Sequence, residues 1–321
     1  MNKRRLLFSA ALLSVAPLLA RAQSGSGAQT IRIILSVPPG GASDTAARLL
    51  AQSLARGLGQ AVVVENRPGG NGVPAVQAVL AAPPDGLTLL WAQASMTGMP
   101  LLVKSAPVKS MAEFTPVTPV INLMYGLLVH PKVPVNNVAE LGAYLKANPD
   151  RLSFGTAVLS EYMVTAKYLR AVGGKALRIP YKGGAQLMPD LISGEVQFYF
   201  GALAPALPHV KSGKLRLLAT LPDRAEATPG VQSLAEAGVP LDGLPLWNGL
   251  LAPPRTPGDV VARLSQEVNR ALADPALRAA FEAQGLRVTG GTPQQLGQAI
   301  ESADTAWRQF IRDYDIPQEG A

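Results

Sequence analysis

The segment "SVPPGGASDTAARLLAQSLARGLG" (Ser36–Gly59) follows the apolar run "IRIILSV" (Ile31–Val37) and leads into a helical pattern. The run is short, rich in β-branched residues and bounded by prolines, which predicts a buried strand. Apolar residues then recur at helical spacing from Ala46 to Leu54, and Gly59 ends the pattern. The prolines and glycines between the two predict a tight connection from strand to helix.

The same alternation continues along the chain. "AVVVEN" (Ala61–Asn66) and "LTLLWA" (Leu87–Ala92) are typical of strands, and the helical stretch "VPAVQAVLAA" lies between them. This order of elements with short connections predicts an α/β fold in which helices flank a parallel sheet. Further on, "LSFGT", "LRIPY", "VQFYFGAL" and "LRLLAT" alternate with helical patterns and predict a second unit of the same kind.

Two similar segments indicate how these units join. "GLLVHPKVPVNNVAEL" begins at Gly126 and "GLLAPPRTPGDVVARL" begins at Gly249. Their separation is too long for a solenoid repeat and fits a chain that crosses twice between two domains. Chance similarity of strand–proline–helix segments is the alternative. We predict domain one at residues 28–125 plus 246–321 and domain two at 126–245, with a ligand cleft between them that closes by hinge motion.

Composition excludes several classes of protein. The chain has 321 residues, 48% of them hydrophobic and 16% charged, which is enough to bury two cores. It has no cysteine, so disulfides and thiolate sites are excluded. No run of basic residues interleaved with aromatic residues is present, and we therefore predict no nucleic-acid partner. We expect a monomer.

The first 22 residues have the layout of a secretory signal peptide. A basic group at Lys3–Arg5 precedes the 15-residue apolar run Leu6–Ala20, and the small residues of Ala20-Arg21-Ala22 follow. The run is shorter than the roughly 20 residues that span a bilayer, which favours cleavage near Ala22 and a periplasmic location over an uncleaved anchor. Both the Sec and the twin-arginine export routes remain open. Without the four basic residues of this segment, the formal net charge falls from +7 to +3.

The first strand-to-helix connection has the chemistry of an anion site. Gly40 and Gly41 let the backbone turn where a side chain would clash, Ser43 can cap the helix and Asp44 can lie in its first turn. Free amides and the helix dipole favour an anion there. Neither the Walker lysine nor the GxGxxG pattern of nucleotide sites is present, and Asp44 would repel a doubly charged phosphate. A carboxylate fits better. A capped turn without a ligand is the alternative.

A matching connection lies in the second unit, at "FGTAVLSEYM" (Phe154–Met163). Gly155, Thr156 and Ser160 supply small and hydroxyl-bearing residues between a strand and a helix. Two such helix starts that face each other across a cleft could hold one carboxylate. Binding from both domains would favour closure, because the ligand gains all its contacts only in the closed state.

Signals for catalysis are weak. The two histidines, His130 and His209, each lie beside a proline, and a surface or structural role is expected for both. Metal-ligand spacings and the GxSxG nucleophile motif are absent from the sequence. Near helix starts and turns, the ordinary role of an acidic residue is solvated capping, and this is expected of Glu161, Asp190 and Glu195. We expect no enzyme activity, no metal and no cofactor.

The chain after the signal peptide resembles the Bug family, the extracytoplasmic solute-binding proteins of tripartite tricarboxylate transporters. The resemblance rests on segments in a specific order: "VPPGGASDTAARLLAQSLARGLGQAVVVENRPGGNG", "APPDGLTLL", "EFTPV", "VAELGAYLKANPDRLSFGT", "IPYKGGAQLMPDLISGEV", "LPHVKSGKLRLLA" and "LLAPPRTPGDVVARLSQEVNRALADP". It implies a fold like that of type II periplasmic binding proteins, with two α/β domains joined by two crossover strands. It also implies a small carboxylate as ligand, such as a dicarboxylic, tricarboxylic or aromatic acid or an acidic amino acid.

The resemblance further implies which residues bind. In the family, a PPGG-x-x-D loop and the domain-two loop after the Y/F-G strand grip a carboxylate, partly through ordered water. The matching positions in this chain are Pro39, Gly40, Gly41, Ser43 and Asp44 in the first loop, and Gly155, Thr156, Ala157 and Ser160 in the second. The predicted ligand-binding set also includes Gln93, Ser95, Leu159, Tyr181 and Gln197.

Two departures from the family pattern affect the expected ligand. The family usually has a longer, glycine-rich second loop followed by a histidine, whereas "TAVLSEYM" is about one residue shorter, bulkier and without histidine. Gln197 stands where an aspartate is usual. Because that aspartate could pair with a ligand ammonium group, its replacement argues against an amino-acid ligand. Val158, Leu159 and Tyr162 would make the pocket tighter or more apolar.

The leading interpretation is a periplasmic protein that captures a small organic carboxylate and delivers it to the membrane subunits of a tripartite tricarboxylate-type transporter. A sensory binding protein that signals to a membrane sensor kinase is an alternative, because its pocket would be the same. An exported hydrolase that uses Asp44 or Glu161 is a further alternative.

Overall fold

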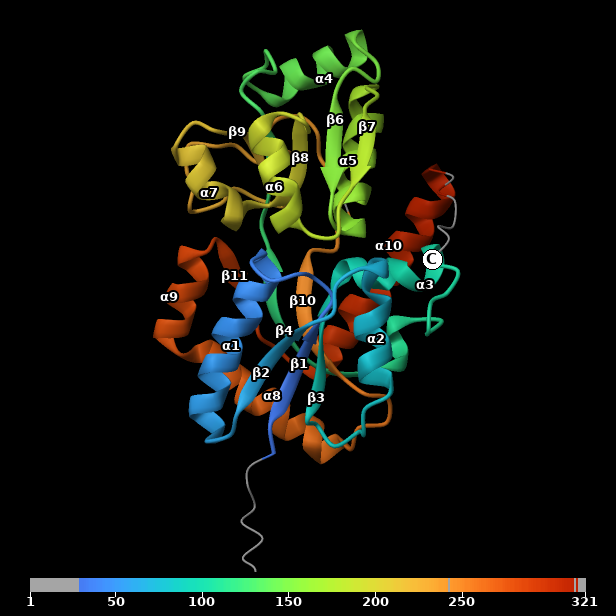
Figure 1. Cartoon of the computed structure of the whole chain (residues 1–321), viewed down its shortest axis with the longest axis vertical. Coiled ribbons are helices and arrows are strands. Elements are labelled where there is room, and N and C mark those ends of the chain that lie inside the picture. Colours follow the sequence, from blue (N-terminus) through green and yellow to red (C-terminus); the bar gives the residue numbers. More distant parts are fainter. Residues whose placement is uncertain (1–28, 242, 315, 317–321) are drawn as a thin grey trace, which may run out of the picture.

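The computed structural model describes residues 29–241, 243–314 and 316 of the chain. They form two lobes, stacked along the long axis of the molecule in Figure 1. Lobe one holds the elements from β1 to β4 and from β10 to α10, and lobe two holds those from β5 to β9. The predicted signal peptide, residues 1–22, lies outside the described residues. Within them, no helix combines the length and the apolar character needed to cross a membrane.

Lobe one is built on a six-stranded sheet in the order β11-β4-β10-β3-β1-β2. Its strands are β1 (Ile31–Leu35), β2 (Val62–Asn66), β3 (Thr88–Gln93), β4 (Thr115–Leu123), β10 (Trp247–Ala252) and β11 (Leu286–Val288). β1 pairs in parallel with β2 and β3, as predicted. However, β10 is antiparallel to β3 and β4, and β11 is antiparallel to β4, so the sheet is mixed and not parallel throughout.

Helices cover both faces of this sheet. Ile33 of β1 packs in one cluster with Leu50 of α1, whereas the next residue, Ile34, packs on the opposite face with Val76 of α2. A strand buried on both faces needs apolar residues on both, which explains why four of the five residues of β1 are isoleucine or leucine. One face carries α1 (Ala42–Leu58), α8 (Gly258–Ala273) and α9 (Pro275–Ala283); the other carries α2 (Val73–Leu80) and α10 (Pro293–Tyr314). Shorter pieces are α3 (Met99–Leu102), η1 (Gly70–Gly72), η2 (Ala94–Gly98) and η3 (Met111–Glu113).

Lobe two is built on a five-stranded sheet in the order β7-β6-β8-β5-β9. Its strands are β5 (Tyr125–Val129), β6 (Ser153–Thr156), β7 (Leu177–Pro180), β8 (Phe198–Ala202) and β9 (Arg216–Leu221). β6 is parallel to β7 and β8, and β5 is antiparallel to β8 and β9. Its helices are α4 (Val138–Ala147), α5 (Leu159–Val172), α6 (Gly184–Ser193) and α7 (Leu203–Lys211).

The chain passes between the lobes at two neighbouring places. β4 ends at Leu123 in the first sheet, and β5 begins at Tyr125 in the second. The return passage leads from β9 into β10, and the Leu123 amide donates to the Leu246 carbonyl at 2.8 Å, which joins the two passages. The similar segments of the sequence are β5 and β10, each an antiparallel strand followed by a turn and a helix, α4 or α8.

A second contact between the lobes connects α5 with the C-terminal half of α10. Leu159 and Met163 of α5 form a buried apolar cluster with Trp307 and Phe310 of α10. The rings of Tyr162 and Phe310 meet edge to face, with centroids 6.0 Å apart. The lobes are thus in contact both at the passages and beside the start of α5.

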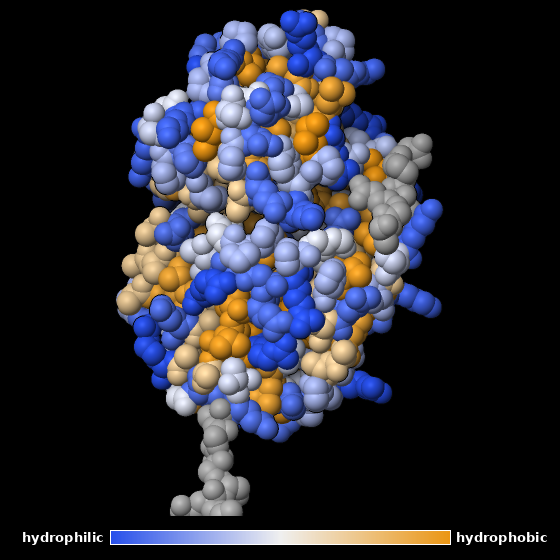
Figure 2. All heavy atoms as spheres, in the orientation of Figure 1, coloured by the Kyte–Doolittle hydropathy of each residue, from blue (hydrophilic) through white to orange (hydrophobic). Residues whose placement is uncertain are grey.

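Hydrophilic and hydrophobic residues are mixed over the face of the molecule that Figure 2 shows. The large hydrophobic side chains that are exposed among the described residues are Val63, Leu177 and Ile179. They lie on β2 and β7, each of which is one of the two edge strands of its sheet. Exposed apolar side chains on an edge strand favour pairing with another chain.

Candidate ligand-binding site

A cavity of about 230 Å³ lies between the lobes, where α1 and α5 begin. Lobe one lines it with the loop after β1, the ends of β3 and the start of β10, and lobe two with parts of β5, α5, α6, β8 and α7. We call it the inner cavity. An adjoining outer cavity of about 630 Å³ shares Val37, Gln93, Ser95, Ala157 and Val158 with it. Both lie beyond the carboxyl ends of β1, β3 and β6, where ligands of open α/β sheets usually bind.

The loop after β1 presents the start of α1 to the inner cavity. Gly40 has φ +91, a conformation that side-chain-bearing residues rarely adopt, and Gly41 is the N-cap of the helix. No side chain caps this end. Amides of the first helical turn have no partner within the helix, and together with the helix dipole they attract an anion. Ser43 was expected as the cap; it lies in the first turn instead, because the helix begins one residue before it.

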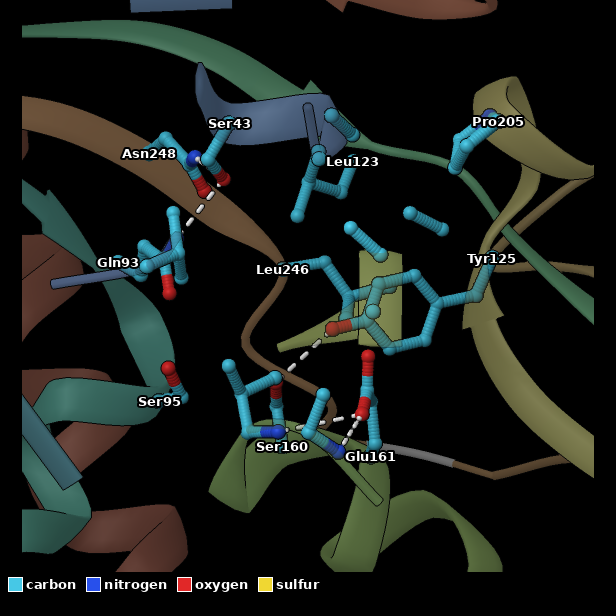
Figure 3. A pocket seen from close by; sticks show the side chains of 18 of the residues that line it. Ser43, Gln93, Ser95, Leu123, Tyr125, Ser160, Glu161, Pro205, Leu246 and Asn248 are labelled. Atoms are coloured by element: carbon cyan, nitrogen blue, oxygen red, sulfur yellow. Dashed lines mark hydrogen bonds between the residues drawn. The ribbon is translucent and has the colours of Figure 1, made fainter. Parts of the chain in front are cut away.

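Ser43 belongs to a buried polar cluster on the lobe-one wall, together with Gln93 and Asn248 (Figure 3). Gln93 Nε2 donates to Ser43 Oγ at 2.8 Å. Asn248 satisfies all its neighbours when its oxygen accepts from Trp91 Nε1 and Ser43 Oγ, both at 2.8 Å, while its nitrogen donates to the Trp247 carbonyl at 3.0 Å. The cluster is neutral and hydrogen-bonded, so it can line an anion site without opposing charge.

Asp44 holds the loop in place and does not line either cavity. Its carboxylate accepts from the Gly40 amide at 3.0 Å, from Asn66 Nδ2 at 2.8 Å and from Arg48 Nε at 3.0 Å. Burial by itself would raise the pKa of Asp44, but the hydrogen bonds from Arg48, Asn66 and Gly40 outweigh it, and the pKa is lowered. The carboxylate therefore stays ionised and fixes the glycine turn that faces the cavity.

The start of α5 carries a buried acid, Glu161, on the opposite wall. Its Oε2 accepts from the amides of Ala157 and Val158, and its Oε1 accepts from the Tyr199 hydroxyl. Burial raises the pKa of Glu161 to about 7, against the opposing effect of these hydrogen bonds. The expected solvated cap is therefore wrong in one respect: Glu161 does cap the helix, but it is only 4% exposed and lines the inner cavity.

Two tyrosines complete the lobe-two wall. The Tyr125 hydroxyl lies 3.0 Å from Ser160 Oγ, and the Tyr199 ring lies across the backbone of Gly201. A Cβ at Gly201 would be 1.9 Å from Tyr199 Cζ, so only glycine leaves room for the ring. Apolar residues such as Leu246 line the rest of the wall. This side of the cavity offers hydroxyl groups, one carboxyl group and apolar surface.

Most of the residues predicted to bind the ligand line one of the two cavities. The inner cavity is lined by Gly40, Gly41, Ser43, Gln93, Ser95, Ala157 and Ser160. The outer cavity adds Thr156, Leu159 and Tyr181. Four predicted residues, Pro39, Asp44, Gly155 and Gln197, line neither. Ten of the predicted residues therefore line a cavity between the lobes, and their part in binding stays a prediction.

Gln197 lies at the wrong end of lobe two. Its Oε1 accepts from the Ser153 amide at 2.7 Å, and its Nε2 donates to the Gly194 carbonyl at 2.6 Å. Ser153 begins β6, whereas the cavities lie at the other end of that strand, beside Thr156. The argument against an amino-acid ligand that used position 197 therefore has no basis in the structure. Gly155 is small for packing, since a Cβ there would be 2.4 Å from Leu187 Cδ1.

The lining includes residues that were not predicted to bind. These are chiefly Tyr125, Glu161, Tyr199, His209 and Asn248. Asn248 gave a usable signal, because it interrupts the apolar run "LPLWNGLLA", and a buried amide must find partners. Tyr125 and Tyr199 gave none, because an aromatic residue in a strand is ordinarily core. His209 lies half-buried on the cavity wall, where a surface or structural role had been expected.

Within the described part of the chain, no cluster of three or more histidine, aspartate or glutamate residues is arranged to hold a metal ion. The site offers helix amides and neutral donors on one wall, and hydroxyls with a buried carboxyl on the other.

Comparison with known proteins identifies the family of the chain. The sequence profile of the tripartite tricarboxylate transporter family receptor matches residues 46–316. Protein BugT of Bordetella pertussis is 33% identical to the chain over 292 residues, which are 89% of each protein. The periplasmic binding protein BugD superposes with a TM-score of 0.83 at 27% identity, covering 90% of this chain and 99% of that one.

Two related structures contain carboxylic acids. MatC from Rhodopseudomonas palustris, with bound malate, has a TM-score of 0.80 at 26% identity and covers 88% of this chain and 98% of that one. A second R. palustris protein, with adipate, has a TM-score of 0.84 at 27% identity over 91% of this chain and 98% of that one. The family and these neighbours are substrate-binding proteins, not enzymes. The chain belongs to the tripartite tricarboxylate transporter receptor family, the Bug-type periplasmic solute-binding proteins.

Proposed function

We propose that the protein captures a small organic carboxylate in the periplasm and delivers it to the membrane subunits of a tripartite tricarboxylate-type transporter. The observation that carries this proposal is the start of α1, which opens into the inner cavity without a side-chain cap. Beside it lies the neutral cluster of Ser43, Gln93 and Asn248. Such a wall suits a carboxylate, because it supplies hydrogen-bond donors, and the charge of Asp44 behind it is paired with Arg48.

Capture would involve closure of domain one (28–125 plus 246–321) on domain two (126–245). Residues of both lobes line the inner cavity, so a ligand makes all its contacts only when the lobes are together. The two passages of the chain, joined at Leu123 and Leu246, are the place for the hinge. The mature protein would be a monomer that begins after a cleavage near Ala22.

Thermal denaturation with a panel of acids tests the capture step. Ligand-free protein, prepared by unfolding and refolding, would be mixed with aliphatic and aromatic mono-, di- and tricarboxylates. At least one acid should raise the melting temperature in a concentration-dependent manner. A hundredfold excess of the acid over Kd should increase the free energy of unfolding by about 2.7 kcal/mol. The proposal fails if none does.

Two serines of α1 provide a matched pair of variants. Ser43 lines the cavity, whereas Ser53 is buried on the same helix away from both cavities. Ser43→Ala should weaken binding of the acid at least about tenfold, which corresponds to 1.4 kcal/mol, and Ser53→Ala should leave it unchanged. Equal effects of the two substitutions would argue against the assigned wall.

The partner is tested separately. With the acid present, the protein should co-purify with the membrane subunits of a tripartite transporter. Recovery with the periplasmic domain of a sensor kinase instead would favour the sensory function and would leave the capture step intact.

A further inference from the structure

The two helix starts that face the inner cavity differ in the acid of the first turn. At α1, Asp44 accepts from the Gly40 amide, pairs with Arg48 and lines neither cavity. At α5, the Glu161 carboxyl accepts from the amides of Ala157 and Val158 and lines the inner cavity, so an acid of the chain faces the ligand at this end. A ligand carboxylate placed at α5 would compete with Glu161 for the same donors.

The surroundings of Glu161 make a second negative charge costly. Glu161 is 4% exposed, and like charges a few ångströms apart repel strongly where water is excluded. The other titratable groups that line the inner cavity are Tyr125, Tyr199 and His209. Burial and the nearby Glu161 charge raise the pKa of Tyr125 and Tyr199, so both are neutral hydroxyl groups. Neither tyrosine can offset an added anion by its charge.

The cationic side chains Arg178 and Lys182 line the outer cavity and not the inner one. Arg178 is engaged within lobe two, where Nε donates to Thr156 Oγ1 at 3.1 Å and the guanidinium lies over the Tyr162 ring. An acid group that enters the inner cavity beside α5 therefore meets Glu161 and hydroxyl groups.

We infer that the ligand carries a single carboxylate, held at the start of α1, and presents an uncharged end to Glu161 and the two tyrosines. This inference rests on the proposed function and narrows its substrate class. The inner cavity, about 230 Å³, is smaller than the pockets of about 300–1,000 Å³ that hold drug-sized ligands, so the acid is small. The chain would then differ from the relatives whose structures contain malate or adipate.

Sets of acids that share one carbon skeleton and one carboxylate, but differ in the group at the opposite end, test the inference. One set is hexanoate, adipate and 6-aminohexanoate; shorter and aromatic sets are butyrate with succinate and benzoate with terephthalate. Calorimetry at pH 8.5, where Glu161 is ionised, should identify the set that fits best. In that set, the monocarboxylate should bind at least about tenfold tighter than the dicarboxylate or the amino acid of the same skeleton. At pH 6, where Glu161 is protonated, the preference over the dicarboxylate should shrink.

Glu161→Gln and Glu140→Gln form a matched pair of variants. Each glutamate lies in the first turn of a lobe-two helix and accepts from a backbone amide before it, but Glu140 is exposed and distant from both cavities. Glu161→Gln should reduce the preference for the monocarboxylate about tenfold at pH 8.5, and Glu140→Gln should leave it unchanged. If Glu161→Gln does not fold, the pH series is run on His209→Gln, which leaves Glu161 as the acid of the cavity wall that the series reports.

Three results would overturn the inference. The first is a dicarboxylate that binds as tightly at pH 8.5 as the monocarboxylate of the same skeleton. The second is weaker binding of the dicarboxylate by Lys182→Ala but not by Glu161→Gln, which would place the second carboxylate in the outer cavity. The third is tighter binding of 6-aminohexanoate than of hexanoate, which would show that the ligand carries a charge at the end opposite its carboxylate. These results leave the proposed function standing, whereas failure of every acid to bind removes that function itself.

Discussion

At the scale of single residues, the site depends on two buried acids in equivalent positions. Asp44 and Glu161 each lie in the first turn of a helix and accept from a backbone amide before it. Asp44 also accepts from Arg48 and Asn66, which lowers its pKa despite burial. Glu161 has only amides and a tyrosine hydroxyl as donors, and burial raises its pKa to about 7. The same local geometry therefore gives one fixed anion and one group that changes charge near neutral pH.

The titration of Glu161 should be visible in protein stability. Its pKa rises from 4.5 to about 7 on folding, so between these values the folded protein binds more protons than the unfolded chain. The free energy of unfolding should therefore decrease as pH rises through that window, by about 3 kcal/mol in total. Urea denaturation at pH 5, 6, 7 and 8 measures the difference between the natural protein and Glu161→Gln, in which this decrease should be absent. A difference that stays constant with pH would contradict the assignment, and Glu140→Gln is the control.

Asp44 should matter for both stability and binding. Asp44→Asn removes the charge that pairs with Arg48 and leaves buried donors poorly matched, which should cost about 1–3 kcal/mol and loosen the glycine turn. Asp304 and Arg308 form a similar pair four residues apart on α10, but the Asp304 side chain is 21% exposed, whereas that of Asp44 is 5% exposed. Asp304→Asn should cost less than about 1 kcal/mol and leave binding unchanged. Chemical denaturation and calorimetry compare the two, and equal losses would contradict the role given to Asp44.

At the scale of elements, the strand–helix alternation was predictable because it depends on local periodicity. The helical pattern that Gly59 ends is observed as α1, and the helical stretch "VPAVQAVLAA" contains α2. β4 was not predicted, since "TPVTPVINL" contains prolines that cannot donate to a ladder. The structure accommodates them where the register between β4 and β10 shifts, beside Pro116 and Pro119. Whether a proline-containing segment forms a strand depends on its pairing with a strand distant in sequence, and the local sequence holds no information on that pairing.

The candidate site also has features that local sequence predicts and others that depend on contacts between distant segments. The two loops were predictable from their glycines and hydroxyl-bearing residues, which follow strands at one sheet edge. Gln197 was assigned to the site by resemblance, and only the register of β6 and β8 shows that it lies at the other end. Tyr199 was missed because its place in the cavity depends on the bare backbone of Gly201, two residues along the same strand.

The dependence of the Tyr199 ring position on the missing side chain at Gly201 gives a prediction for β8. Gly201→Ala would place a methyl group within about 2 Å of the Tyr199 ring, which must move and withdraw its hydroxyl from Glu161. We expect a loss of about 1–3 kcal/mol of stability, as for other overpacked sites, together with weaker ligand binding. Gly57→Ala is the control: position 57 is exposed on α1 with nothing within 4 Å of the new Cβ, and it should stabilise by up to about 1 kcal/mol. Thermal melts and calorimetry decide, and unchanged binding in Gly201→Ala would contradict the placement of Tyr199.

At the scale of the whole molecule, two connections hold the lobes in their relative position. One is the pair of chain passages, joined by the hydrogen bond between Leu123 and Leu246. The other is the apolar cluster of α5 and α10, in which Leu159 also lines the outer cavity. Opening about the passages would separate or shift this cluster and expose apolar surface. The cluster should therefore favour the closed state even without ligand.

Phe310 is the residue through which this idea can be tested. Phe310→Ala and Phe281→Ala each remove a buried phenyl ring from lobe one, at a cost of about 3–5 kcal/mol. Phe281 lies on α9, which packs against α1, α8 and β11 of lobe one, whereas Phe310 contacts α5 of lobe two. If closure depends on the cluster, the ligand-free Phe310→Ala protein should have a larger radius of gyration by X-ray scattering. It should also bind its acid more weakly, because less of it is competent to bind. Phe281→Ala should change neither quantity, since its loss destabilises the lobe without biasing the angle between the lobes. The same scattering profile for both variants, at temperatures where each is folded, would mean that the passages alone set the closed geometry.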